Sequence, residues 1–261
     1  ESGPIRARLR VTSRRCASTL TQIFSLRVDS AQLFCDATVD WHERYKRLKL
    51  VFPMRMEHPR AFYQIPFGVL ERPCDGEEES AQQWIAVSNE ERTCALLNTN
   101  KYSFSVCDAT MMLTAVRSPL FADHGGERLE EASYTDQGES SFGYALRFDC
   151  GRDFASLTRA AAELNTPPAS VFEGTHDGAL PPCASHASVS APNIVITAVK
   201  RAENGNGIIV RLCESTGKAA HAHVMLLGAS FDTHFTPWSV QTYRIAEDGA
   251  VSETLLTEMD M

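Results

Sequence analysis

The stretch that decides the fold class is Gln32-Leu33-Phe34-Cys35-Asp36-Ala37-Thr38-Val39-Asp40. Successive side chains of a strand point to opposite faces. One face of this stretch therefore carries the apolar residues Leu33, Cys35, Ala37 and Val39. The other face carries both of its acidic residues. This strict alternation predicts a β-strand over residues 32–40.

Similar short apolar runs lie on both sides of this stretch, separated by turn residues such as Asn98-Thr99-Asn100. They predict strands at 5–11, 20–28, 48–52, 62–65, 84–87, 93–97, 102–106, 111–116 and 141–148. Regular short strands with frequent turns favour a sandwich or barrel over a βαβ sheet, so we predict an all-β fold. The acidic run Glu77-Glu78-Glu79 follows Asp75-Gly76 and is interpreted as a solvated loop tip.

One helix is predicted among these strands. Phe154, Leu157 and Ala161 lie three to four residues apart, which predicts a helix over 153–164 with Asp153 as its N-cap. The next residues are rich in Pro, Ser, Ala, Gly and His and show no sustained period, so they are interpreted as a linker. We expect a first domain at 1–165, a linker at 166–190 and a small β-sandwich at 191–261.

The second strand-rich block is predicted to contain strands at 194–199, 208–212, 222–227 and 241–245. Alternate residues of 208–212 form one apolar face, and alternate residues of 222–226 form another. Burying both faces on one side of a hairpin pairs Leu212 with Ala222. A slip of one residue would instead place His221 in the core, so we predict the first register.

Composition narrows the function classes. The 261 residues carry a net charge of −8, and Lys and Arg do not cluster, so we expect no nucleic-acid partner. No apolar segment is long enough to span a membrane. The eight cysteines form no CxxC pair, and several lie within apolar strands, which favours a reducing compartment and hence the cytoplasm. A strand directly after Glu1-Ser2-Gly3-Pro4, with no initiating Met, indicates a chain cut from a longer one.

The sequence contains no GxSxG, HExxH, P-loop or GxGxxG motif. The pair His221-x-His223 would share one face of a strand, but a metal site needs a third ligand that the spacing does not reveal. A solvated pair is therefore favoured. Asp123 and Asp136 lie in one long polar stretch, where carboxylates suit either acid–base chemistry or an ordinary loop.

Arg117 directly follows the apolar run 111–116 and precedes Ser118-Pro119, so it lies where a strand enters a loop. At such a place a guanidinium can hydrogen-bond a polyhydroxylated ligand or a partner carboxylate, and it can equally form a surface ion pair. The three tryptophans suit either a core or a sugar-stacking platform. They are Trp41, Trp84 and Trp238.

Several strings resemble the C-terminal region of glycoside hydrolase family 38 α-mannosidases of the bacterial or cytosolic type. They occur in the family's order over nearly the whole chain, and include TVDWHER at 38–44, IPFGVLERP at 65–73, DQGE at 136–139, ITAVK at 196–200 and IVRL at 209–212. The resemblance implies a partial galactose-mutarotase-like supersandwich with one helix, followed by a small β-sandwich. It also implies a parent enzyme that hydrolyses α-mannosides with retention.

In that family, zinc or another divalent metal and an aspartate nucleophile belong to an N-terminal catalytic domain. The motifs of that domain are missing here, so the resemblance implies no cofactor and no catalytic residue in this chain. It implies that the chain packs against the catalytic domain of the same polypeptide and shapes the cleft for an α-mannoside. Arg117 is the candidate that reaches the substrate, and Asp123 is a second substrate-binding candidate. A sheet edge left unpaired by truncation also favours a homo-oligomer.

Two alternatives stay open. An independent carbohydrate-binding module would present its tryptophans on the surface as a platform. A self-contained sugar epimerase rests on fold analogy alone, and the sequence shows no His/Glu acid–base pair in the expected strands.

Overall fold

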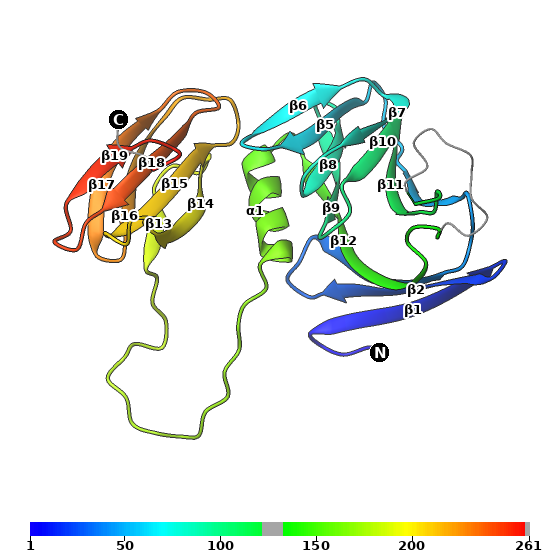
Figure 1. Ribbon diagram of the computed structural model, residues 1–261, viewed down its shortest axis with the longest axis horizontal. Helices are drawn as coiled ribbons and strands as arrows, with labels where there is room; N and C mark the ends of the chain where they lie inside the picture. Colours follow the sequence, from blue (N-terminus) through cyan, green and yellow to red (C-terminus); the bar gives the residue numbers. More distant parts are fainter. Residues whose placement is uncertain (122–132, 259–261) are drawn as a thin grey trace. The chain divides into compact units, whose positions relative to one another are not determined.

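The structure is a computed structural model that describes residues 1–121 and 133–258 (Figure 1). The chain divides into two compact units. The first comprises Glu1–Gln64, Leu70–Asp153 and Ala160–Asn165, and the second comprises Ile65–Val69, Phe154–Arg159 and Thr166–Met261. The predicted helix is confirmed as α1 (Phe154–Asn165). The domain boundaries expected at 165 and 190 stay predictions. Within the described residues, no helix is long and apolar enough to cross a membrane.

Two sheets build most of the first unit. The larger has the strand order β1-β2-β3-β12-β9-β8-β5-β6, and the smaller has the order β4-β11-β10-β7. The strands of the larger sheet are β1 (Arg6–Arg15), β2 (Ser18–Arg27), β3 (Gln32–Trp41), β12 (Gly138–Cys150), β9 (Arg92–Asn98), β8 (Trp84–Ser88), β5 (Arg60–Ile65) and β6 (Gly68–Arg72). Those of the smaller sheet are β4 (Arg47–Pro53), β11 (Thr110–Arg117), β10 (Ser103–Cys107) and β7 (Asp75–Ser80).

The core of the first unit lies between the inner faces of these sheets. The alternation predicted for residues 32–40 is confirmed, because Cys35, Ala37 and Val39 of β3 are buried in this core. The smaller sheet contributes inner residues such as Phe104 and Leu113 to the same core. The all-β prediction is therefore confirmed, with β-sandwich packing as the physical basis.

The second unit is a small sandwich of two further sheets. One has the order β13-β16-β17, and the other has the order β14-β15-β18-β19. Their strands are β13 (Ala187–Val189), β16 (Ala220–Leu226), β17 (Ala229–Phe235), β14 (Ile194–Arg201), β15 (Ile208–Glu214), β18 (Val240–Ile245) and β19 (Val251–Thr254). Strand β13 lies inside the segment interpreted from its composition as a linker, and it pairs with β16.

The predicted pairing of Leu212 with Ala222 is wrong. Strand β15 pairs with β14 and β18, whereas β16 pairs with β13 and β17 in the other sheet. The two predicted apolar faces do lie in one core, where Val210 and Val224 are both fully buried. They meet across the sandwich instead of side by side in a hairpin. An alternating pattern fixes which face is buried, and both arrangements bury the same residues.

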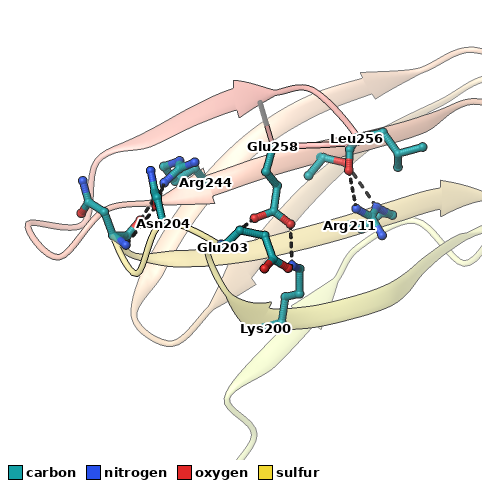
Figure 2. A network of polar contacts seen from close by, with 9 residues as sticks. Lys200, Glu203, Asn204, Arg211, Arg244, Leu256 and Glu258 are labelled. Atoms are coloured by element: carbon teal, nitrogen blue, oxygen red, sulfur yellow. Dashed lines mark hydrogen bonds and ion pairs between the residues drawn. The ribbon is translucent and has the colours of Figure 1, made fainter. Parts of the chain in front are cut away.

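Charged side chains hold the last described residues of the chain onto the second unit (Figure 2). The Arg211 guanidinium donates to the Leu256 carbonyl at 2.8 Å. The Glu258 carboxylate accepts from the Glu203 backbone N–H at 2.9 Å and pairs with the Lys200 ammonium at 2.7 Å. The side chains differ in exposure, since that of Glu258 is 3% exposed and that of its partner Lys200 is 37% exposed. We assign these contacts the local role of holding the last described residues against β14 and β15.

A buried carboxylate fixes the end of β15. Glu214 is fully buried, and its oxygens accept hydrogen bonds from the Asn193 amide, Thr216, the Gly217 N–H and the Trp238 N–H, at 2.7 to 3.0 Å. Burial opposes ionisation, but the hydrogen bonds led by that from Trp238 outweigh it and hold the Glu214 pKa below its ordinary value. The turn after β15 is thereby built around one ionised acceptor.

Replacing Glu214 with glutamine tests this interpretation. The amide turns an NH2 group toward backbone donors, so Glu214→Gln should lower the free energy of unfolding by about 1–3 kcal/mol in urea denaturation. Because the folded pKa is depressed, the carboxylate stabilises above the ordinary carboxyl pKa. The difference between the two proteins should therefore shrink on acidification through the folded pKa. Glu253→Gln, on an exposed side chain, is the control, and an equal loss in both would refute the special role of Glu214.

Candidate functional site

The outer face of the smaller sheet carries a cluster of charged and hydroxyl side chains around Glu78. Its carboxylate pairs with the Arg47 guanidinium at 2.9 Å and with the Lys49 ammonium at 3.0 Å. The hydroxyls of Ser103 and Thr114 donate to its other oxygen, Thr114 at 3.0 Å. The prediction of a solvated loop tip at 77–79 is thus wrong, since these residues belong to β7 and Glu78 lies directly opposite Ser105 of β10.

The environment of Glu78 determines its protonation state. Partial burial raises the pKa of the carboxyl, but hydrogen bonds from Ser103, Lys49 and Thr114 outweigh that effect and lower the pKa to about 2. A group with this pKa stays ionised at neutral pH and cannot serve as a general acid there. The Glu78 carboxylate therefore acts as a fixed acceptor that holds Arg47 and Lys49 in place.

Arg117 ends β11 at the margin of the same face. It lies directly opposite Arg47 of β4, and opposed residues of an antiparallel pair project from the same side of a sheet. The ladder register shifts between Thr114 and Val116, which is a β-bulge. The side chain of Arg117 is exposed, and none of the residues in 1–121 and 133–258 is seen to pair with its guanidinium.

The backbone of Arg117 is held by two residues that lie just before β12. Its N–H donates to the Asp136 carboxylate at 3.1 Å, and its carbonyl accepts from the Thr135 hydroxyl at 2.9 Å. The next residue, Ser118, is fully buried and accepts from the Trp41 indole N–H at 3.1 Å. Asp136 thus anchors the strand end. Asp123, the second substrate-binding candidate, lies outside the described residues.

The tryptophans do not form a common surface platform. Trp41 and Trp84 are buried, and Trp238 is 41% exposed. The aromatic ring of Trp238 lies against Gly217, where a Cβ in place of the glycine hydrogen would approach the ring to 2.7 Å. Two of the three rings thus belong to the core, so the arrangement gives no support to an independent carbohydrate-binding module.

The pair His221 and His223 projects outward from β16, as expected for a solvated face. Sequence reasoning did not find their neighbours Asp232 and His234, because β17 was not predicted as a strand. Across residues 1–121 and 133–258, no three His, Cys, Asp or Glu side chains already converge on one point suited to a metal ion. In the arrangement described for residues 1–121 and 133–258, these side chains do not form the donor set that a catalytic metal needs.

The fold and the site together define a two-unit β-sandwich protein with a fixed, positively charged strand end. Comparison with known families identifies it further. The family model "Glycosyl hydrolases family 38 C-terminal domain" matches residues 1–125, and "Glycosyl hydrolases family 38 C-terminal beta sandwich domain" matches residues 193–258. The chain belongs to glycosyl hydrolase family 38 and carries domains of its C-terminal region.

Similar proteins agree with this membership. α-Mannosidase 2C1 of Mus musculus is 32% identical over 213 residues, which cover 77% of this chain and 19% of that protein. α-Mannosidase G of Dictyostelium discoideum is 27% identical over 239 residues, 84% of this chain and 21% of that protein. The chain spans about a fifth of the length of these relatives.

A solved structure supports the fold. The crystal structure of an α-mannosidase from Enterococcus faecalis V583 superposes with a TM-score of 0.75 at 20% identity, over 87% of this chain and 29% of that one. At this identity the likeness concerns the fold alone. It agrees with the all-β organisation of both units.

Neutralising Glu78 tests whether its carboxylate stabilises the charged outer face of the smaller sheet. Glu78→Gln removes the charge that compensates two cations, so we expect the free energy of unfolding to fall by about 1–3 kcal/mol near neutral pH. The depressed pKa means that the carboxylate stabilises above its ordinary pKa and that this contribution is lost as the pH falls toward about 2. The wild type should thus lose its advantage over the variant in acid.

Glu77→Gln is the matched control, because the neighbouring Glu77 is exposed. It should change the free energy of unfolding by less than about 0.5 kcal/mol. Equal effects of the two substitutions in urea denaturation would contradict the assignment of Glu78 as the acceptor of this face.

Proposed function

We propose that this chain is a non-catalytic C-terminal portion of an α-mannosidase, where it packs against a catalytic domain of the same polypeptide and shapes the cleft for an α-mannoside. The observation that carries the proposal is the match of both units, in order, to the two C-terminal domains of family 38. The match covers only 19% of the Mus musculus α-mannosidase 2C1, which leaves room for a separate catalytic domain in a protein of that length.

Arg117 is the residue that we propose to reach the substrate. Its backbone is fixed by Asp136 and Thr135, and its exposed guanidinium lies beside a face already positive through Arg47. A guanidinium presents five N–H donors in a rigid fork, which suits vicinal hydroxyls of a sugar or a carboxylate of a neighbouring domain. Asp123 keeps its place in the proposal as a second contact.

The hydrolysis itself is assigned to the catalytic domain. Retaining glycoside hydrolysis needs two carboxyl groups about 5–5.5 Å apart, one as nucleophile and one as acid–base. The best-defined carboxylate of the described face, Glu78, is occupied by its hydrogen-bond donors. Zinc or another divalent metal likewise belongs, in this proposal, to the catalytic domain.

The same proposal places the chain in the cytoplasm. Its support is the presence of Cys35, Cys94 and Cys213 as buried free thiols. A reducing compartment keeps thiols in this form.

An activity assay separates the chain from its parent. The full-length polypeptide and this 261-residue chain are each incubated with an aryl α-mannoside and zinc or cobalt. We expect turnover by the full-length polypeptide and none by the chain, because the chain lacks the catalytic groups in this proposal. Turnover by the chain alone would overturn it.

Substitution of Arg117 in the full-length enzyme tests the contact with substrate. Arg117→Ala should lower kcat/KM by about 10- to 100-fold, or about 1.4–2.7 kcal/mol of transition-state stabilisation. Arg117→Lys should retain only part of the wild-type kcat/KM, because an ammonium group lacks the planar fork of N–H donors. Arg201→Ala, an exposed arginine at the end of β14, is the control. A loss no larger than that of the control would remove Arg117 from the cleft.

A further inference from the structure

The outer face of β16 and β17 gathers three histidines and an aspartate. His221 and His223 flank Ala222, which is buried in the sandwich core, so both rings project to the opposite side. The register places His234 directly opposite His221 and Asp232 directly opposite His223. Opposed residues of an antiparallel pair share a face, so the four side chains form a compact square.

The spacing of this square suits a single small ion. The rings of His221 and His234 have centroids 4.5 Å apart at an interplanar angle of 52°. Same-face neighbours on one strand lie about 6.6 Å apart at their Cα atoms, from two steps of about 3.3 Å. The four side chains line one open surface depression together with Ser190, Ala222 and Thr233. All four are exposed, so their rings can turn at little cost.

Asp232 already orients one of the rings. Its carboxylate lies 3.0 Å from Nδ1 of His223. A carboxylate in this position favours the tautomer with the proton on Nδ1, which leaves Nε2 as a lone-pair donor. Metal-binding histidines in proteins commonly have such a carboxylate behind them.

We propose that His221, His223 and His234 bind one divalent transition-metal ion, such as Zn²⁺, on this face, with Asp232 as the positioning residue for His223. Three neutral imidazoles and an open fourth position are a donor set that Zn²⁺ accepts. The rings do not converge in the present arrangement, so binding turns them toward a common point above the sheet. The inference does not rest on the proposed mannosidase function.

The test uses the whole chain, stripped of metal with a chelator, and Zn²⁺ alone as the probe. Calorimetric titration should give one ion per chain at this site. His221→Ala, His223→Ala and His234→Ala should each weaken binding by at least about tenfold, and Asp232→Asn by about tenfold or more.

A histidine just before β13 provides the control. His186 is exposed and does not belong to the square, so His186→Ala should bind Zn²⁺ as the wild type does. Far-UV circular dichroism checks that each variant is folded. In nitrogen-15 NMR spectra, the imidazole signals of His221, His223 and His234 should shift together on addition of Zn²⁺.

Two results would overturn the inference. One is Zn²⁺ binding by the triple variant His221→Ala/His223→Ala/His234→Ala as tight as by the wild type. The other is an unchanged imidazole spectrum in the presence of Zn²⁺ that saturates the wild-type chain.

Discussion

The buried apolar core between the two sheets of the first unit is the constraint on which the rest of that unit depends. Burying Cys35, Ala37 and Val39 of β3 against residues such as Leu113 of β11 fixes which side of each strand faces inward. The charged cluster around Glu78 lies on the outer face of the smaller sheet, on the side away from core residues such as Phe104 and Leu113.

Much of this core could be predicted from the sequence. Where apolar and polar residues alternate strictly, as in residues 32–40, the sequence predicts both that the segment is a β-strand and which of its faces is buried. Strand β7 could not be found in this way, because Asp75–Ser80 contains no apolar side chain. Strand β7 is held in the sheet by its pairing with β10 and by hydrogen bonds that side chains of neighbouring strands donate to the Glu78 carboxylate. Those donors are distant in sequence, so the local pattern resembles a loop.

The second unit shows a different limit. The apolar faces of β15 and β16 were predictable, but their partners were not, since a hairpin and a sandwich bury the same residues. The choice depends on residues 215–219, which carry the chain from one sheet to the other. Glu214 binds the backbone of this segment, with hydrogen bonds to the N–H groups of Thr216 and Gly217. A buried carboxylate that accepts hydrogen bonds from backbone N–H groups produces no periodic pattern of apolar residues, so the sequence does not reveal it.

The candidate site depends on a similar local feature. Strict alternation from Leu113 would place Ala115 and Arg117 on the same inner face, and a guanidinium there would have to leave water for an apolar core. The bulge in β11 inserts one residue, so that Ala115 and Val116 are both buried and Arg117 turns outward. The position of Arg117 at a strand end was readable from the sequence, whereas its direction was not. The fold thus places a charged side chain on the surface by an irregularity in one strand, while the core on the other side stays apolar.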